Sequence, residues 1–532
     1  MLNRLTVTIL VGIIGYGTLL NEAHADDMDF GEDEVAAIGE IPHIVEMIEE
    51  GKALYEQKKY AEASLLFHTV LRDDTMGAEI HFPEAEYELA KTLFRMELYQ
   101  GALAYFGRIV DEGDFHPFYT GALHGLLLLG EAVPGDALLT ERLSAFSDRF
   151  PHEIPDEYRD AFAYSVGLHF YNTMEIDEAL RMLNAVTSRS SLYAKARYIT
   201  AITHVANYDA KPAVDAFRDV LRYLMGRNES GSLNAEERQL LELAQLGMAR
   251  VFYSTGQFDT SLRYYSQIRR TSPLWLDALF ESSWAYFQVD RFNHALGNLH
   301  TLNSPFFADA HYPEGPILSA VIYFYNCNYP RVRNVLEDFE YHYEGLKNEL
   351  DTVLDQHQDP MDMYGWVTKM QSGEGRFDAG MQSIFRASLQ DQQIQQRFNL
   401  VESINREKAK KEAMPESWKT SRLGDTLIQE ATLAHSFAMT DAGELAQQRL
   451  QRVVRELDEL VLQQKRIMFE VARAERGEIE SDIRAGMLVD GHETPTDAFN
   501  VTDEHLYWTF DGEYWRDELG FYVFSIGSEC RR

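Results

Sequence analysis

A carboxylate-rich stretch near the C-terminus holds the residue types that acid–base catalysis uses most often. Asp511, Glu513, Asp517 and Glu518 fall within eight residues of one another. A pair of carboxylic acids catalyses hydrolysis only where the surroundings push the two pKa values apart. A short surface turn leaves such pKa values ordinary, so we expect no catalysis from this group.

The histidines do not indicate metal chemistry. His116, His124 and His169 fall in helical stretches, whereas a zinc site needs three or four converging ligands. His342 lies two residues from Glu340 and two from Glu344, a spacing that places the three side chains on different faces of a helix. We therefore expect these histidines to serve packing.

Motifs of nucleotide binding and nucleophilic catalysis are also missing from the sequence. The glycine cluster Gly12-Ile13-Ile14-Gly15-Tyr16-Gly17 has no strand–loop–helix pattern around it, so it does not predict a phosphate-binding loop. The chain has no H-E-x-x-H zinc motif and no G-x-S-x-G nucleophile elbow. The sequence predicts a non-catalytic protein that uses no cofactor and no metal.

The charge balance argues against two further classes of function. The chain carries 49 basic and 85 acidic residues, a net charge of −36. Nucleic-acid binding requires a basic face that displaces counterions from phosphates, and an anionic lipid surface attracts basic segments for the same reason. The acidic excess predicts a well-solvated surface, with attraction to a basic partner as the alternative.

The first 25 residues have the three parts of a secretory signal peptide. Arg4 precedes the apolar run Leu5–Leu20, and Ala23-His24-Ala25 offers small residues for cleavage after Ala25. A membrane anchor is the alternative, but the run is shorter than the roughly 20 apolar residues that span a bilayer. Residues 1–25 are thus predicted to direct export, and residues 26–42 to form an acidic, flexible N-terminus of a soluble mature chain.

A four-residue pattern recurs through the following part of the chain. Each copy has a bulky residue, two variable residues and a small residue. The final residues of the copies are Ala63, Ala102, Ala137, Ala179, Ala213, Ser261, Ala295 and Val332. They are spaced by 39, 35, 42, 34, 48, 34 and 37 residues, and a period near 34 is that of a solenoid of helical hairpins. The longest spacing predicts an inserted loop around residues 226–231.

Apolar residues between these copies recur at helical spacing. Between Asp277 and Leu302 they predict two helices with a break at Val289-Asp290-Arg291. A small residue such as Ala295 allows the two helices to approach closely, and Pro273 ends the preceding helix because proline lacks an N–H. We expect an all-α helical-repeat domain over residues 43–345.

These units resemble the tetratricopeptide repeat. Three units carry residues at that family's signature positions, while looser units depart from it, with His204 in place of an aromatic residue and Pro134-Gly135 at a turn. The matching residues are Ala249, Phe252, Gly256, Phe258, Ser261, Tyr265, Ile268 and Pro273 in one unit, Gly51, Tyr60, Ala63, Phe67 and Val70 in another, and Gly167, Phe170, Ile176, Ala179, Leu183 and Val186 in the third.

The resemblance implies a scaffold that binds peptides on the concave face formed by the first helix of each repeat. Tyr, Trp and Arg are the residues that most often anchor protein interfaces, and several fall on this face. The implied contact residues are Tyr87, Lys91, Arg95, Tyr164, Tyr171, Asn172, Arg250, Tyr253, Trp284 and Gln288. The alternative is that C-terminal helices fill the groove and bury these side chains.

Residues 346–486 are predicted to form long helices. Pro415 separates a glutamine-rich helix within residues 377–411 from a second helix that extends from about Leu423 to Ala485. The second helix has a coiled-coil-like apolar seam with one polar member, Gln464. The seam consists of Leu450, Val453, Leu457, Leu460, Gln464, Ile467, Val471 and Ala474. An antiparallel hairpin, a homodimer, or packing on the repeats would each bury this seam.

Residues 487–532 are rich in aromatic residues. Asp511-Gly512 between the runs Leu506–Phe510 and Glu513–Arg516 predicts a β-hairpin, with a third strand over residues 521–526. Strands this short cannot form a large core, so we expect this β-like element to dock on helices. It acts either as a structural cap or as an aromatic binding patch.

The two cysteines of the chain are Cys327 and Cys530. A disulfide between them requires an oxidising compartment and Cα atoms within roughly 7 Å of each other. The predicted export satisfies the first condition, and such a bridge would tie the C-terminal tail to the last repeat.

The combination resembles periplasmic tetratricopeptide proteins of Gram-negative bacteria that support envelope assembly or surface motility. The stretch Phe510–Gly520 is similar to a segment of such proteins in gliding, predatory bacteria. The resemblance implies an exported scaffold that binds another envelope protein, located in the periplasm or at the periphery of a membrane. The alternatives are a peptidoglycan- or carbohydrate-binding protein that uses the aromatic C-terminal element, and an enzyme with a divergent site at Asp511 or Glu513.

Overall fold

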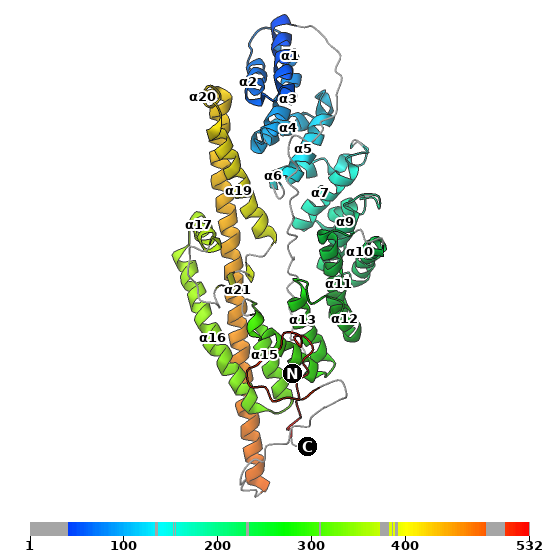
Figure 1. The fold of residues 1–532 in the computed structure, drawn as a ribbon, viewed down its shortest axis with the longest axis vertical. Coiled ribbons are helices and arrows are strands. Elements are labelled where there is room, and N and C mark those ends of the chain that lie inside the picture. The colour runs from blue at the N-terminus through cyan, green and yellow to red at the C-terminus, as the bar shows by residue number, and fades with distance from the viewer. Residues whose placement is uncertain are drawn as a thin grey trace. The chain divides into compact units, whose positions relative to one another are not determined.

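The computed structural model describes residues 41–133, 137–152, 154, 156–229, 233–307, 310–372, 382, 384–385, 387–388, 392–485 and 506–530. The predicted signal peptide, with Ala25, lies outside the described residues, as does the acidic N-terminus up to residue 40. The described residues form helices joined by turns, and none of them belongs to a strand (Figure 1). Within this part of the chain, no helix combines the length and apolarity needed to cross a bilayer.

Helical hairpins follow one another from residue 42 to residue 356, which confirms the predicted all-α repeat fold. The hairpins are α1 (Pro42–Glu56) with α2 (Tyr60–Val70), α3 (Phe82–Arg95) with α4 (Tyr99–Glu112), α5 (Tyr119–Ala132) with α6 (Ala137–Ser144), α7 (Arg159–Asn172) with α8 (Ile176–Leu183), α9 (Tyr193–Ala206) with α10 (Ala210–Glu229), α11 (Ala235–Ser254) with α12 (Phe258–Tyr265), α13 (Trp275–Gln288) with α14 (Phe292–Leu302), and α15 (Glu314–Tyr325) with α16 (Tyr329–Gln356). The loop predicted around residues 226–231 is wrong at its start, because α10 stays helical as far as Glu229.

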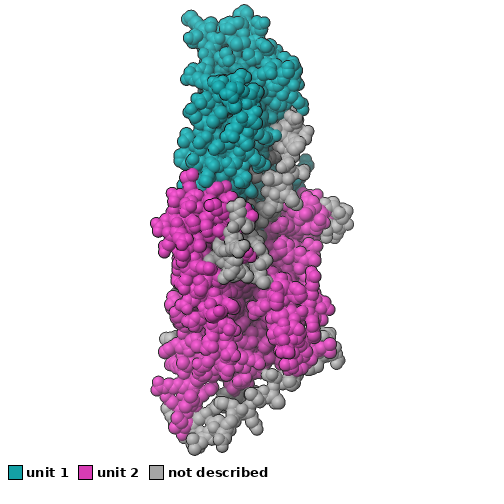
Figure 2. Space-filling view, turned by 60° about the vertical axis from the view of Figure 1, so that its left-hand side comes forward, with its two compact units in different colours: residues 1–220, 392–443 teal, residues 221–391, 444–532 magenta. Residues whose placement is uncertain are grey.

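The remaining helices are α17 (Pro360–Gln371), α19 (Gln392–Ala413), α20 (Glu416–Lys419) and α21 (Arg422–Ala485). The chain divides into two compact units, which Figure 2 shows in different colours. Unit 1 comprises residues 1–220 and 392–443, and unit 2 comprises residues 221–391 and 444–532. Each unit therefore combines repeats with a part of the long C-terminal helices.

Seven of the described hairpin turns share one backbone conformation. In each, a residue with positive φ stands two positions before the second helix, with φ between 56° and 75°. These residues are Lys58, Glu97, Met174, Tyr208, Gly256, Asp290 and Cys327. The next residue donates its N–H to the carbonyl five positions back, at 2.8–2.9 Å, as in Arg291 to Tyr286. This bond satisfies a carbonyl at the end of the first helix and reverses the chain.

Small residues occupy the point where the two helices of a hairpin cross. Ala63, Ala102, Ala179 and Ala295 have no exposed surface, and neither has Ser261. The Ser261 hydroxyl also donates to the carbonyl of Ala249 in the facing helix, at 2.7 Å. A larger side chain here would push the helices apart, so the recurrence of small residues follows from close packing.

In unit 1, α19 and the first part of α21 form an antiparallel pair. The ion pair Arg397–Asp441 (2.9 Å) and the bond from Lys411 Nζ to the Leu427 carbonyl (3.0 Å) join them near opposite ends of α19. Lys411 is buried and also pairs with buried Glu407 at 2.7 Å. The predicted antiparallel arrangement is thus present in this part of the chain.

In unit 2, the later part of α21 pairs antiparallel with α16. Lys347 binds Asp458 at 3.0 Å, and the amide of Gln464 donates to Glu340 at 3.2 Å. Seam residues Leu460 and Val471 belong to the apolar cluster formed by α13–α16. The predicted seam therefore packs against helices of its own chain. This packing gives no support to a homodimer through the seam, which stays a prediction.

The predicted β-hairpin near the C-terminus is not confirmed. Residues 506–530 contain turns but no strand. The backbone bonds within the segment are those of turns, such as Phe521 N–H to the Glu518 carbonyl (2.9 Å), and others reach the repeats, as in Phe524 N–H to the Asn293 carbonyl (2.9 Å) and Glu529 N–H to the Asn326 carbonyl (2.9 Å). Asp511-Gly512 favours a hairpin turn only through local geometry, and the contacts of this segment with the repeats determine its structure instead.

The shared turn conformation makes Tyr208 a site for stabilisation. Its side chain is 96% exposed, so little packing is lost on substitution. A positive φ destabilises the folded state of a non-glycine residue by roughly 1–2 kcal/mol. Glycine removes this cost, but it loses more conformational entropy on folding, which offsets about 0.5–1 kcal/mol of the gain. We expect Tyr208→Gly to raise the free energy of unfolding by about 0.5–1 kcal/mol in urea titrations.

The matched control is Tyr208→Ala, which removes the same side chain but keeps the backbone cost. It should leave the free energy of unfolding within about 0.5 kcal/mol of the original chain. Equal stabilisation by both variants would show that the ring, and not the backbone, is unfavourable.

Candidate interaction site

The first helices of the repeats carry the ten predicted contact residues, but the structure places these residues in different surroundings. Tyr87, Lys91 and Arg95 lie on α3, and Tyr164, Tyr171 and Asn172 lie on α7, all in unit 1. Arg250, Tyr253, Trp284 and Gln288 lie on α11 and α13 in unit 2. The residues on α3 take part in a cluster of polar contacts between two repeats.

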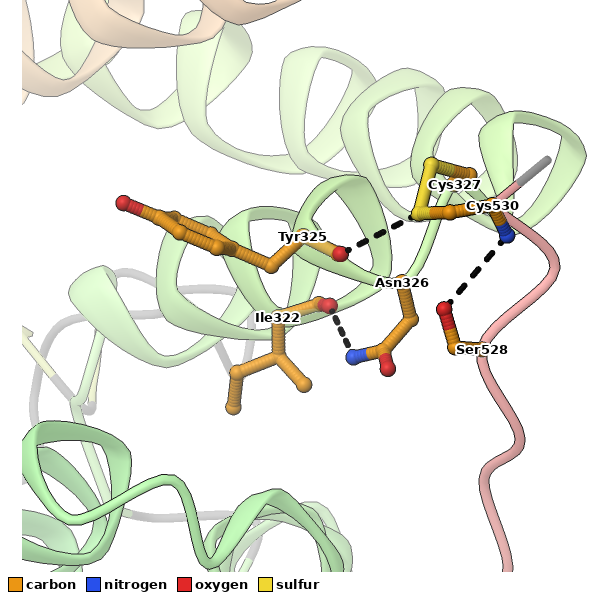
Figure 3. The surroundings of a disulfide bond; sticks show 6 residues. All are labelled: Ile322, Tyr325, Asn326, Cys327, Ser528 and Cys530. Carbon is orange, nitrogen blue, oxygen red and sulfur yellow. Dashed lines mark hydrogen bonds between the residues drawn. A yellow bond between two sulfur atoms is a disulfide. The ribbon is translucent and has the colours of Figure 1, made fainter. Parts of the chain in front are cut away.

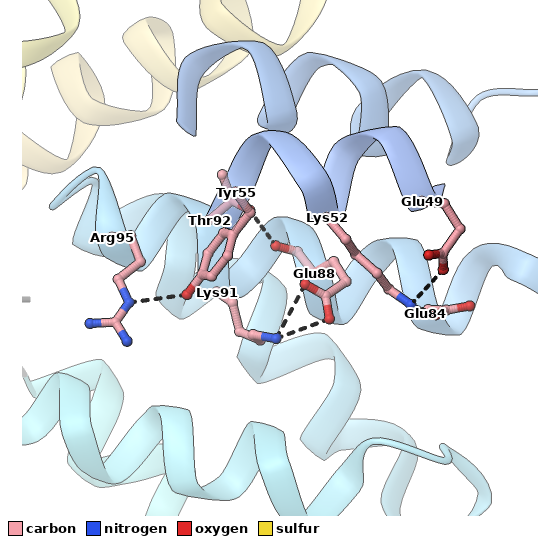
Figure 4. Close-up of polar contacts among 8 residues, drawn as sticks. All are labelled: Glu49, Lys52, Tyr55, Glu84, Glu88, Lys91, Thr92 and Arg95. Atoms are coloured by element: carbon pink, nitrogen blue, oxygen red, sulfur yellow. Dashed lines mark hydrogen bonds and ion pairs between the residues drawn. The ribbon is translucent and has the colours of Figure 1, made fainter. Parts of the chain in front are cut away.

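Lys91 and Arg95 lie one turn apart on α3 and face α1 (Figure 4). Arg95 Nε donates to the Tyr55 hydroxyl at 3.0 Å, which links the first helices of the first two repeats. The Lys91 ammonium lies 5.4 Å from the centroid of the Tyr55 ring and 5.2 Å from that of Tyr87. Cations within about 6 Å of an aromatic face are attracted to it, so these contacts hold Lys91 in place. We call Lys52, Tyr55, Lys91 and Arg95 the α1–α3 surface.

Carboxylates balance the cations of this surface. Lys91 pairs with Glu88 at 2.9 Å, and Lys52 pairs with Glu84 at 2.6 Å and with Glu49 at 3.1 Å. Burial alone would lower the pKa of Lys52. The carboxylates of Glu84 and Glu49 raise it by more than burial lowers it, so the pKa lies above its ordinary value. The ammonium thus stays charged at neutral pH.

Tyr87 is the least accessible member of the predicted set in unit 1. Its side chain is 2% exposed and its ring stacks on Phe118, with centroids 4.8 Å apart. Tyr171 is also buried, and burial raises its pKa, whereas Asn172 is exposed at the end of α7. Tyr87 and Tyr171 therefore support the repeats from inside.

The predicted residues of unit 2 are engaged within their own unit. The Arg250 guanidinium binds both carboxylate oxygens of Glu281, at 2.6–3.1 Å, and Tyr265 donates to the same carboxylate at 3.0 Å. Trp284 packs against the apolar cluster that contains Leu460 and Val471 of α21. In unit 2, Trp284 thus lies next to a C-terminal helix, as the alternative interpretation expects, whereas Arg250 is held by the neighbouring repeat.

Unit 1 differs in where its C-terminal helices bind. Trp418 of α20 donates its indole N–H to Ser64 of α2 at 3.0 Å, and Glu407 of α19 accepts from the N–H of Gln100 in α4 at 3.1 Å. These are contacts with second helices of the repeats. The α1–α3 surface, formed by first helices, keeps partial exposure among the described residues.

Sequence reasoning missed Lys52 and Tyr55. A usable signal was present, because Lys52 precedes Lys91 by 39 residues, the same distance that separates Ala63 from Ala102. Equivalent positions in successive repeats face the same side.

The acidic residues near the C-terminus lie in an exposed turn. The Glu513 carboxylate accepts from the N–H of Asp511 at 2.8 Å in an exposed turn. Within the described part of the chain, no three His, Cys, Asp or Glu residues are arranged to hold a metal ion.

Comparison with known proteins supports the repeat assignment for the region of this surface. Residues 48–117, from α1 to just beyond α4, match the tetratricopeptide repeat family. The apo form of RapI is 12% identical, with 65% of this chain and 98% of that chain covered and a TM-score of 0.35. The tetratricopeptide domain of P58(IPK) is 11% identical, with 74% and 99% covered and a TM-score of 0.18. No curated protein matches the chain.

The bond between Arg95 and Tyr55 gives a stability prediction. Tyr55→Phe keeps the ring next to Lys91 but removes the hydroxyl that accepts from Arg95. A partly buried hydrogen bond to a charged group contributes about 1–2 kcal/mol, so the free energy of unfolding should fall by about that amount in urea titrations. Tyr208→Phe, which removes a solvent-exposed hydroxyl, is the control and should change nothing; an equal loss in both variants would contradict the assignment.

Proposed function

We propose that this chain is a non-catalytic scaffold that binds a protein partner through the α1–α3 surface. The observation that carries the proposal is the meeting of Tyr55, Lys91 and Arg95 from the first helices of two consecutive repeats. Such helices line the binding face in solenoids, and Tyr and Arg are common interface anchors. The tetratricopeptide match over the same residues supports this assignment.

The geometry suits recognition of another polypeptide better than chemistry on a small molecule. The cations are held by fixed contacts, so little side-chain entropy is lost when a partner binds. A partner can supply carboxylate or carbonyl oxygens to Lys91 and Arg95 while Tyr55 contributes ring surface. Recognition of this kind needs neither a deep cavity nor a titrating nucleophile.

We further propose that the chain is exported and that its partner is an envelope protein, as an envelope-assembly or motility scaffold would require. Arg4, the apolar run after it and the small residues ending at Ala25 support export. The Cys327–Cys530 disulfide is compatible with an oxidising compartment.

A capture experiment tests the scaffold. The mature chain and the double variant Lys91→Ala/Arg95→Ala are immobilised and exposed to the same envelope extract. We expect a protein recovered by the original chain to be reduced at least about tenfold with the variant, since loss of two anchors exceeds about 1.4 kcal/mol. Mass spectrometry identifies and quantifies the captured protein.

The matched control is Lys211→Ala/Arg218→Ala, which removes two cations from exposed positions of α10. Arg218 forms an i,i+3 ion pair with Asp215, as Lys91 does with Glu88. Circular dichroism verifies that all variants fold. Undiminished capture by the α3 variant would overturn the α1–α3 surface. Capture that is lost instead with Trp515→Ala, a residue that is 46% exposed, would place the protein contact on the aromatic C-terminal element.

The proposed export gives a separate prediction. Cleavage after Ala25 should leave a mature chain that begins at Asp26, readable by N-terminal sequencing of the protein from the periplasmic fraction. An intact N-terminus in the cytoplasmic fraction would contradict export and leave the binding proposal untouched.

A further inference from the structure

The C-terminal segment Tyr514–Cys530, here called the strap, lies across α14 and the ends of its neighbours in unit 2. It has no strand or helix of its own. Its backbone is instead recognised by side chains and carbonyls of the repeats. Main-chain hydrogen bonds together with side-chain contacts are also what hold a bound peptide on a protein surface.

The first contacts lie where α12 leads into α13. Arg270 donates to the carbonyls of Arg516 and Asp517, at 3.0 Å each. Its guanidinium also lies 5.0 Å from the Phe521 ring centroid and 5.7 Å from that of Trp275. Arg270 thereby contacts the strap twice, through hydrogen bonds to its backbone and through a cation–π contact with the Phe521 ring.

The central contacts lie on a single face of α14. Asn293, Gly297 and Thr301 are four residues apart and so follow one side of the helix. The Asn293 carbonyl accepts from Phe524 N–H at 2.9 Å, and the Thr301 hydroxyl accepts from Gly520 N–H at 3.0 Å.

Gly297 sits between these two bonds, under the strap backbone. A Cβ built there would collide with the carbonyl of Tyr522. His300 borders the same face, with its ring stacked on Tyr514 at 4.7 Å and in contact with Tyr522 at 5.1 Å. The face of α14 is thus shaped for close approach of a peptide backbone.

The last contacts lie at the α15–α16 turn (Figure 3). Cys327 and Cys530 form a disulfide, with Cα atoms 5.0 Å apart. Next to it, Glu529 N–H donates to the Asn326 carbonyl at 2.9 Å and Asn328 Nδ2 donates to the Glu529 carboxylate at 2.7 Å. The disulfide is the one covalent bond between the strap and the described repeats, and the other contacts are hydrogen bonds and ring contacts.

We propose that the α14 face is a docking site for an aromatic peptide without helix or strand, that the strap occupies it in the same chain, and that the disulfide holds this occupant in place. A dithiol opens this disulfide by thiol–disulfide exchange. Its two sulfurs become a disulfide, and the two electrons and two protons that they give up convert Cys327 and Cys530 to thiols. The strap then exchanges with solvent, and the α14 face becomes available.

The test uses the full chain with a protease recognition sequence introduced within residues 490–500. After cleavage, the strap fragment should stay attached in oxidising buffer and dissociate at nanomolar concentration once dithiothreitol is added. A fragment that remains bound after reduction would overturn this role of the disulfide. A reduced, uncut chain that dimerises would place the strap on a second copy and overturn the assignment to the same chain.

The docking site is tested by adding back a labelled peptide of residues 506–530 with Cys530→Ser to the cut, reduced and strap-free chain. Fluorescence anisotropy should show saturable binding, weakened at least about tenfold by Gly297→Ala, a loss of about 1.4 kcal/mol. The control is Gly315→Ala on α15, where a Cβ would meet nothing nearer than Leu299 at 3.5 Å. Absence of saturable binding, or equal binding by both variants, would overturn the site.

Discussion

The hydrogen bond that closes seven of the described hairpin turns is the constraint from which the rest of the molecule follows. A residue in the left-handed conformation allows the next N–H to reach back to a carbonyl of the first helix, as in Arg291 to Tyr286. This sets the angle at which the second helix leaves, and the small residue three positions into that helix then meets the first helix closely. Because these seven hairpins are closed in the same way, equivalent side chains of consecutive first helices come to one side. The pairing of Tyr55 with Arg95 is a direct consequence.

The C-terminal helices give the two units different surfaces from similar repeats. In unit 1, α19 and α20 contact second helices through Glu407 and Trp418, so the first helices keep their partly exposed polar residues. In unit 2, α21 joins the apolar cluster of α13–α16, and the strap binds α14. Repeats of the same type thus have two roles. Where α21 packs against them they support the fold, and where their first helices stay partly exposed, as in α1 and α3, they offer a candidate contact surface.

Periodic features of the sequence predicted the fold well. Apolar spacing and the recurrent small residues gave the hairpins, and the long helix was expected from about Leu423 to Ala485 against an observed Arg422–Ala485. Most of the left-handed turns could not be foreseen, because residues such as Lys58, Glu97 and Tyr208 carry no sign of positive φ, whereas Gly256 and Asp290 are of types that favour it. Residues 506–526 were predicted as a β-hairpin with a third strand because Asp511-Gly512 is a local signal, whereas the bonds of this segment to Asn293 and Thr301 depend on residues more than two hundred positions away. The α1–α3 surface was half predicted, since Lys91 and Arg95 were named but their partner Tyr55 comes from another repeat.

The disulfide has a mechanical consequence. It joins residues 203 positions apart, so the chain from Cys327 to Cys530 is a covalent loop that contains α16, α17 and all of the long C-terminal helices. Force applied at the C-terminus passes directly through the sulfur bridge into the α15–α16 turn and bypasses that loop. A pull between the two termini would therefore unravel the repeats before Cys327, while α19 and α21 would carry no direct tension. Reduction would restore the full contour of the chain and transfer the load to the long helices.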